Sequence, residues 1–434
     1  MDTEATMIAL GRLLKEKCIE FHGDAEFNGC VDHLLELTTK LAFRSGVQGE
    51  ETMEKCRRLV NHFTSSSQAL EALKRKQIDR VPVGVIQDVV TRWWSTYAMG
   101  VRLLQLRNYI SIMTEDGLIP RELNLSNSQW DILNETTDLL EPFMVAQKVL
   151  EGEKYVTISL VLLIITTIRN KLQAAAANVN LEAPHVSELS RSLLENFNKH
   201  WGDGMPGTVY DESIVHGRER PRGIPRRTLL ATYLDPRTKD LAVLDNIDKS
   251  LIKHAIKEKL LILGRVKTDI HEGIQAHTVD KNAEIAVNDM QANVNNRALF
   301  GILDGEEIPN DVDESHQADN NVEELVDAEL TLWEREPKLP RAVQRNDGTL
   351  YFPNPLIWWR KNENRFPRIA SLAAQYLAIQ ATSASSERLF SVAGLTISKD
   401  RARLTSDNAA MLIFLHDNID NIRNWRAENG YSEI

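Results

Sequence analysis

The sequence has few cysteines and no surplus of basic residues, and each absence excludes a class of protein. Cys18, Cys30 and Cys56 are the three cysteines among 434 residues. Three is too few, and an odd number, for a disulfide framework, so the composition indicates a reducing compartment. The formal net charge is −11. A general nucleic-acid coat protein would carry a basic excess, so that class is excluded, whereas a local basic groove is not.

A secretory signal and a long apolar run are also absent. The first residues lack the basic and then apolar pattern of a signal peptide. The most apolar run, 156–168, contains four Thr or Ser and is shorter than a bilayer span, so we interpret it as a buried helix or strand and expect no membrane partner. What is present is ordinary for a globular protein, with 42% apolar and 26% charged residues. The length suffices for two or three core-forming units.

Three helices are predicted near the C-terminus. The first begins at Pro367, and its apolar residues recur with helical spacing at Ile369, Leu372, Ala373, Tyr376 and Leu377. The second runs from about residue 383 to 393 and ends at Gly394. The third opens after Thr405-Ser-Asp, a good capping sequence. Its apolar stripe is broad enough to pack on two sides, which suits either its own core or a dimer interface: Met411, Leu412, Phe414, Leu415, Ile419 and Ile422.

Four motifs carry candidate chemistry, each with a structural alternative. Glu387, in Ser383-Ala-Ser-Ser-Glu-Arg-Leu-Phe-Ser, is either a catalytic acid or half of an ion pair. In Cys30-Val-Asp-His33, the Cys and His could supply one half of a zinc site, with Cys18 and His22 as the other half. Alternatively, both side chains pack in a core. Arg92-Trp93 could bind a phosphate and stack on a base, or begin a helix. Tyr233-Leu-Asp-Pro-Arg-Thr-Lys239 is interpreted as a structural turn.

Together these motifs resemble the hAT group of DNA transposases and the host proteins derived from them. The block over roughly 325–421, with Pro353-Asn-Pro-Leu-Ile-Trp-Trp and Ser-Ser-Glu-Arg-Leu-Phe-Ser, resembles the family's C-terminal dimerisation region. The resemblance implies that Asp2 and Glu387 are the second and third catalytic carboxylates, and that Trp93 handles the flipped base or hairpin during transposon excision. It also implies Mg²⁺ or Mn²⁺ in the intact enzyme. The apolar positions expected to serve dimerisation are Trp358, Trp359, Phe390, Leu412, Leu415 and Ile419.

The resemblance implies a mainly α chain of four parts. They are a remnant of an RNase H-like α/β core (1–80) whose first strands are missing, a helical insertion domain (81–300), a disordered acidic linker (301–330) and the dimerisation region (331–425). The linker is expected because 304–329 contains eleven Asp or Glu and no Lys or Arg. A BED zinc finger, common at the family's N-terminus, is not formed by these three cysteines.

The first catalytic Asp has no counterpart here, so the two-metal site would lack a ligand. We therefore expect a truncated or domesticated protein in the nucleus. It would need no cofactor as this chain and would be catalytically inactive while retaining dimerisation with itself or a related hAT protein. Two alternatives stay open: a partial sequence of an active transposase, and a DNA-binding module that uses Arg92, Trp93 and the five Arg within 218–227.

Overall fold

The structure is a computed structural model, and it is mainly helical, as the sequence predicts. It describes residues 30–42, 47–89, 93–177, 184–202, 223–275, 315–344, 350–396 and 405–428. Within these ranges the strands are β1 (Val343–Gln344) and β2 (Leu350–Tyr351), which pair antiparallel with Val343 opposite Tyr351. An RNase H-like sheet is therefore not seen in the described part of the chain.

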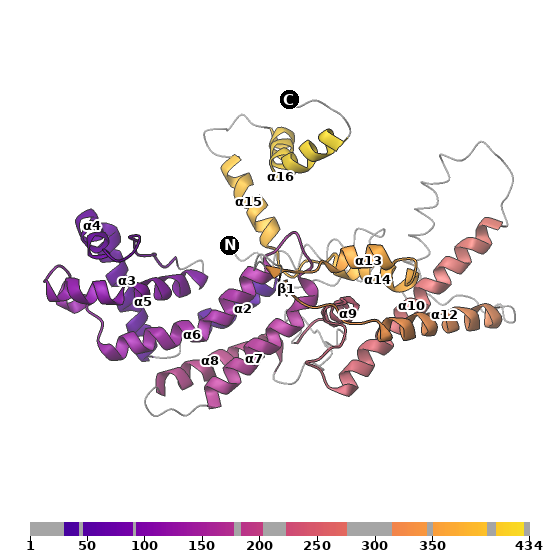
Figure 1. The fold of residues 1–434 in the computed structure, drawn as a ribbon, viewed down its shortest axis with the longest axis horizontal. Helices are drawn as coiled ribbons and strands as arrows, with labels where there is room; N and C mark the ends of the chain where they lie inside the picture. Colours follow the sequence, from indigo (N-terminus) through magenta and orange to yellow (C-terminus); the bar gives the residue numbers. More distant parts are fainter. Residues whose placement is uncertain are drawn as a thin grey trace.

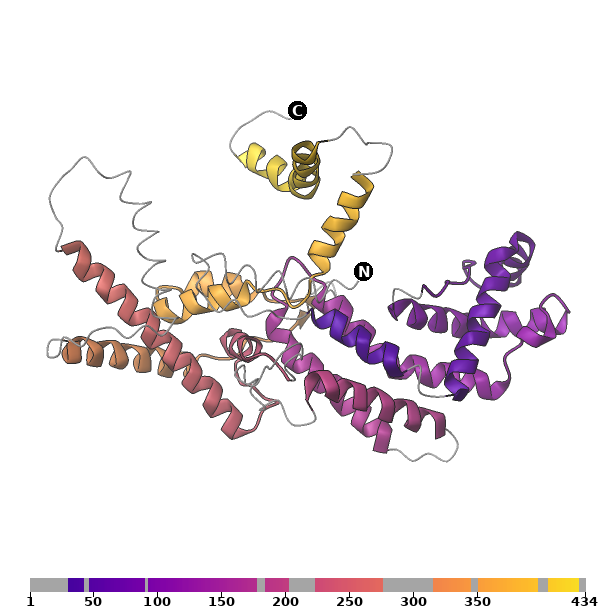
Figure 2. The same cartoon turned by 180° about the vertical axis from the view of Figure 1, so that it is seen from behind.

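The helices divide into those before and those after residue 223. The earlier ones are α2 (Val31–Ala42), α3 (Val47–Ser65), α4 (Ser67–Lys76), α5 (Trp93–Glu115), η2 (Arg121–Leu123), α6 (Asn127–Leu150), η3 (Ile158–Leu160), α7 (Val161–Ala177) and α8 (Pro184–Trp201). The later ones are α9 (Arg226–Leu234), α10 (Asn246–Gln275), α12 (Ser315–Arg335), α13 (Pro355–Asn362), α14 (Pro367–Leu377), α15 (Ala384–Thr396) and α16 (Ser406–Glu428). Figure 1 shows an elongated body from which α15 and α16 project, and Figure 2 shows the same from behind.

Local sequence explains where several helices begin. Ser126 and Gln129 form a reciprocal capping box at the start of α6. Asn354 caps α13, where its side chain accepts the Leu356 N–H at 2.9 Å, and Pro355 occupies the first turn. Pro367 begins α14 as predicted. Helix α15 runs to Thr396, two residues beyond the predicted end at Gly394.

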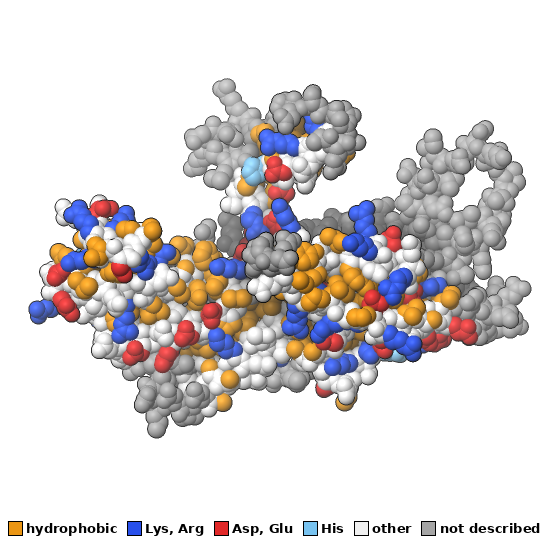
Figure 3. Space-filling model, in the orientation of Figure 1, with side chains coloured by type: hydrophobic (Ala, Val, Ile, Leu, Met, Phe, Trp, Pro, Cys, Tyr) orange, Lys and Arg blue, Asp and Glu red, His pale blue; other side chains and the backbone are white. Residues whose placement is uncertain are grey.

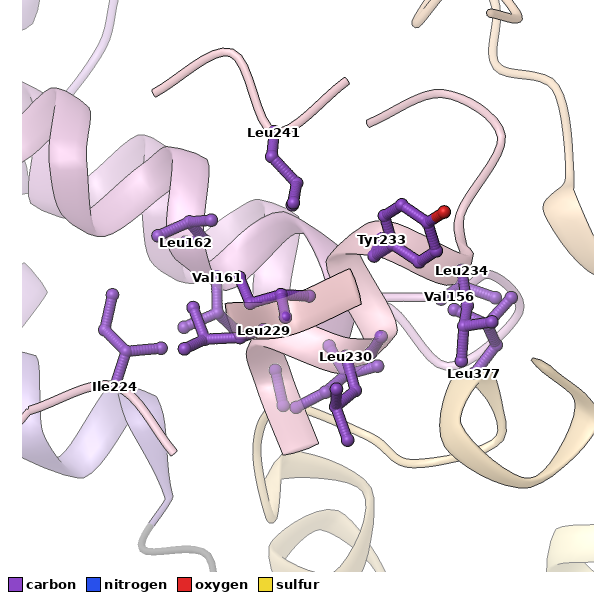
Figure 4. Close-up of a cluster of buried hydrophobic side chains, with 14 of the residues drawn as sticks. Val156, Val161, Leu162, Ile224, Leu229, Leu230, Tyr233, Leu234, Leu241 and Leu377 are labelled. Carbon is purple, nitrogen blue, oxygen red and sulfur yellow. The ribbon is translucent and has the colours of Figure 1, made fainter. Parts of the chain in front are cut away.

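The larger hydrophobic core joins parts of the chain that are far apart in sequence. It takes residues from α2, the C-terminal half of α6, α7 to α10 and α12 to α14. Figure 4 shows part of it, where Leu229 of α9 lies beside Val161, and Leu234 lies beside Val156 and Leu377. The expected domain limits at residues 80 and 330 are therefore not the limits of this core.

A second core lies at the other end of α6. It is built by α3, α4, α5 and the N-terminal half of α6, with Phe63, Leu103 and Trp130 among its buried side chains. Leu133 of α6 belongs to this core, whereas Leu139 belongs to the larger one. Helix α6 thus contributes buried side chains to both cores, and the contacts of α2 with α5 and of α3 with α8 also join them.

The apolar run 156–168, predicted to be a buried helix or strand, forms η3 and the first half of α7, so the first of the two alternatives holds. Among the described residues, 158–177 is one stretch long and apolar enough to cross a membrane. Five of its apolar side chains are buried in the larger core: Val161, Leu162, Ile165, Ile168 and Leu172. The apolarity of this stretch is therefore explained by packing.

The acidic linker prediction needs a correction from residue 315 onward. There the chain forms α12, and Val322, Val326 and Trp333 bury one face of it in the larger core. Lys257 of α10 pairs with two of its acids, Glu323 and Asp327, at 2.9 and 2.8 Å. The high acidic content predicted disorder, but Val322 and Val326 have the apolar i, i+4 spacing that favours a helix. Residues 301–314 lie outside the described ranges.

Candidate functional site at the base of the C-terminal helices

Glu387 lies in the first turn of α15 with its side chain exposed. Ser383 Oγ donates a hydrogen bond to Glu387 Oε1 at 2.8 Å, and the Glu387 N–H donates to the Ser383 carbonyl at 2.9 Å. A carboxylate in the first turn of a helix is favoured by the helix dipole. The Ser383–Glu387 pair therefore fixes this acid at the surface, beside the turn that begins α15.

The Cys30–His33 element lies against the same turn. The Ser383 N–H donates to Cys30 Sγ at 3.4 Å, although 353 positions separate the two residues. The backbone N–H of His33 also bonds the sulfur, so Cys30 satisfies donors at the start of α2. Burial raises the pKa of the Cys30 thiol, and these hydrogen bonds oppose only part of that rise. The side chain serves here as a hydrogen-bonding cap, and a reactive thiolate is disfavoured.

Asp32 interacts electrostatically with two other acidic residues. Burial, followed by the negative charges of Glu151 and Glu387, raises its pKa to about 8, while the charge of Arg388 opposes the rise. Asp32 is therefore largely protonated at neutral pH. Sequence reasoning missed Asp32 and Glu151 because only tertiary packing brings them to Glu387.

The described acids do not fit the Mg²⁺ or Mn²⁺ that the family resemblance implies. Mg²⁺ needs several hard oxygen ligands in near-octahedral geometry. In the part of the chain that the structure describes, no group of three or more His, Cys, Asp or Glu side chains could hold a metal ion. Asp32 would also have to lose a tightly held proton. Of the residues considered as zinc ligands, Cys18 and His22 lie outside the described residues. His33 Nδ1 lies 3.8 Å from Glu36 Oε2.

The other expected catalytic and DNA-binding residues are not placed by the structure. Asp2 and Arg92 lie outside the described residues, as does the side chain of Trp93. The next residues begin α5: Ser95 and Thr96 donate to the buried Asp88 at 2.7 and 3.0 Å. This end of the Thr91–Thr96 motif therefore has a structural role at the helix start.

Trp358 and Trp359 lie in an aromatic cluster of their own chain. The Trp359 ring centroid is 4.8 Å from that of Trp333 and 4.9 Å from that of Trp358, and Phe366 completes the group. Trp359 is only 3% exposed, and its Nε1 donates to the Leu234 carbonyl at 2.9 Å. Trp359 was expected at a dimer interface, but the structure buries it inside the chain because its large ring fills the core.

The remaining residues expected to serve dimerisation are on the surface. Phe390 of α15 is 71% exposed. Leu412, Leu415 and Ile419 of α16 are exposed as well, and so are Met411, Phe414 and Trp425. In α16 the buried apolar side chain is Ala409 alone among the described positions. The chain on its own thus leaves a large apolar surface in water.

The Asp-Pro-Arg block is a turn, as interpreted, and it also fastens the C-terminal region. Asp235 and Arg237 form a buried ion pair at 2.6 Å, and Arg237 Nη1 donates to the Pro353 carbonyl at 3.3 Å. Lys239 Nζ donates to the carbonyls of Trp333 and Glu336 at the end of α12. The sequence signalled the turn, but it held no signal for these distant partners.

Comparison with known proteins agrees with these features. Residues 329–419 match the hAT family C-terminal dimerisation region. The chain is similar to "Zinc finger BED domain-containing protein 4" of Homo sapiens, with 21% identity over 95% of this chain and 30% of that protein. It is also similar to "Putative AC transposase" of Zea mays, with 23% identity over 89% of this chain and 43% of that protein. The chain thus spans less than half the length of these two relatives.

Proposed function

Because residues 329–419 match the hAT dimerisation region, we propose that this hAT transposase-related protein associates with a second copy of itself or with a related hAT protein. The contact surface is the exposed apolar side of α15 and α16. The observation that carries the proposal is α16 itself. Five consecutive apolar residues, 411–415, lie in one helix turn and a half, and Met411 and Phe414 are 62% and 60% exposed.

The spacing within α16 suits packing against another helix. Leu412, Leu415, Ile419 and Ile422 follow one another at intervals of three, four and three residues, which is the seam spacing of paired helices. Burying one such side chain contributes about 1.5–3 kcal/mol, so a few of them offset the cost of association. A second copy presents the same stripe and provides a matching surface.

The test is sedimentation velocity of the full chain over a micromolar concentration range. Leu412→Glu places a charge in the seam, and we expect the dissociation constant to rise at least tenfold. Leu251→Glu is the matched control, because Leu251 of α10 is 50% exposed and Leu412 is 44% exposed. The control should change the dissociation constant less than twofold. A folded wild-type chain that stays monomeric would contradict the proposal.

Catalytic inactivity belongs to the same proposal. The alternative, an active transposase of which this is a part, is favoured by the bond between Ser383, the partner of Glu387, and Cys30, because it brings together two of the motifs that resemble the hAT family. Strand cleavage of transposon-end DNA in Mg²⁺ by the full gene product, lost in Glu387→Gln, would support that alternative. The active-transposase alternative also includes an RNase H-like ancestry of the N-terminal residues.

DNA binding and a nuclear location stay proposals from family resemblance. On the face drawn in Figure 3, basic and acidic side chains alternate along the body, so this face does not favour DNA. Binding through Arg92 and Trp93 should weaken steeply with salt. No retention on duplex or single-stranded DNA at low salt would remove this function.

A further inference from the structure

Helices α15 and α16 form an arm that leaves the body, with α16 packed at the far end of α15. No described residue of this arm belongs to either hydrophobic core. The direction of the arm therefore depends on the contacts at its base, where Ile379 and Ala381 pack on the larger core and polar groups bond the body. The base is the turn 378–383 together with the first two turns of α15.

One loop of the body, residues 151–157, holds that turn. Thr157 Oγ1 donates to Gln380 Oε1 at 3.0 Å and accepts the Ala381 N–H at 3.0 Å. From the other side, the Val31 N–H of α2 donates to the Ala381 carbonyl at 3.2 Å. The turn is thus fastened by α2 and by the 151–157 loop.

The shape of the 151–157 loop depends on Gly152. The Tyr155 hydroxyl donates to the Val149 carbonyl at 2.6 Å, which folds the ring back over the loop. A Cβ at position 152 would meet the Tyr155 ring at 2.1 Å. Glycine at 152 therefore allows the loop to present Glu151 and Glu153 on the side that faces α15.

Arg388 of α15 bonds this loop directly. Its Nε donates to Glu153 Oε1 at 2.8 Å, its Nη2 donates to the same carboxylate, and Nη2 also donates to the Glu151 carbonyl at 3.0 Å. Both ends of the pair are about half exposed, 50% for Arg388 and 48% for Glu153. A substitution here is therefore tolerated by the fold.

Arg388 differs from an ordinary surface ion-pair residue because several acidic groups lie around it. The carboxylates of Glu151 and Glu387 act on Asp32, and Glu153 contacts Arg388 itself. Arg388 is the cation that opposes this acidic group. Removal of Arg388 would take away the bonds from α15 to the Glu153 carboxylate and the Glu151 carbonyl, and would leave Glu153 without this cation.

We propose that Arg388 is a positioning residue for association: by holding α15 on the 151–157 loop, it sets the direction in which α16 presents its apolar surface to a second copy. This inference rests on the proposed self-association. An arm that samples many directions offers a competent surface only part of the time, and the apparent affinity falls by that fraction.

Two measurements on the full chain test this role separately. Hydrogen exchange by mass spectrometry follows the amides of 378–390, which report the fastening within one chain. Sedimentation velocity gives the dissociation constant between chains. The variants are Arg388→Glu, the charge swap Arg388→Glu with Glu153→Arg, and Lys253→Glu as control. Lys253 pairs with Glu334 between α10 and α12, and both are 46% exposed.

We expect Arg388→Glu to raise both the exchange rate at the arm base and the dissociation constant at least fivefold. The charge swap should restore both toward wild type, and Lys253→Glu should change neither. Unchanged exchange in Arg388→Glu would overturn the proposal, and so would faster exchange with an unchanged dissociation constant. A monomeric wild type would overturn the proposed function and the role in association, while the exchange rates would still show whether Arg388 fastens the arm.

Discussion

At the scale of single residues, Asp32 makes stability depend on pH. Its pKa of about 8 lies above the ordinary 3.8 because burial and two neighbouring acids disfavour the charge. The folded state therefore keeps this proton after the unfolded chain has lost it. Between about pH 4 and pH 8 the free energy of unfolding should fall as pH rises. Urea unfolding should show that the free energy of unfolding falls less between pH 5 and pH 8 in Asp32→Asn than in the wild type. Asp131→Asn, which changes an exposed acid on α6, should leave this pH dependence as in the wild type.

Arg237 is a residue whose loss should strongly destabilise the fold. Asp235 is fully buried, and it also accepts a hydrogen bond from Ser159 Oγ at 2.6 Å. Arg237→Gln would leave a buried carboxylate without its cation, and we expect about 3–5 kcal/mol of destabilisation in urea unfolding. Lys338→Gln removes the exposed pair with Asp240 and should cost less than about 1 kcal/mol. Similar losses in the two variants would refute this ranking.

At the scale of elements, α5 and α6 approach closely at Gly100. A Cβ there would meet Thr137 Cγ2 at 2.5 Å and Leu133 Cδ1 at 3.3 Å. Gly100→Ala should therefore push the helices apart and cost about 1–3 kcal/mol. Gly49 of α3 is the control, because a Cβ there meets nothing within 4 Å. Gly49→Ala should instead stabilise the protein by about 0.5–1 kcal/mol. Thermal unfolding of both variants distinguishes the two signs.

Elements were predictable from sequence where a local signal decides them. Helix α14 follows from Pro367 and the spacing of Ile369, Leu372 and Leu377, and α16 follows from its capping residues. Helix α12 was missed because the acids of 304–329 outweighed three buried apolar residues. The surroundings of Glu387 depend on contacts such as Ser383 with Cys30, 353 positions apart, and no local pattern encodes such a distance.

At the scale of the whole molecule, the two cores that share α6 should respond separately to damage. Leu103→Ala removes a fully buried side chain from the smaller core, and Leu230→Ala does so in the larger one. Each should cost about 2–5 kcal/mol. Because the two cores share no buried side chain, hydrogen exchange in Leu103→Ala should rise within 47–133 and stay near wild type in 223–260.

Leu230→Ala should show the reverse distribution, with faster exchange in 223–260 and in α14. Hydrogen exchange along α6 shows whether unfolding of one core affects the other, because Leu133 lies in one core and Leu139 in the other. Its N-terminal half should follow Leu103→Ala, and its C-terminal half should follow Leu230→Ala. Uniformly faster exchange along the chain in either variant would mean that α6 transmits unfolding and that the two cores form one cooperative unit.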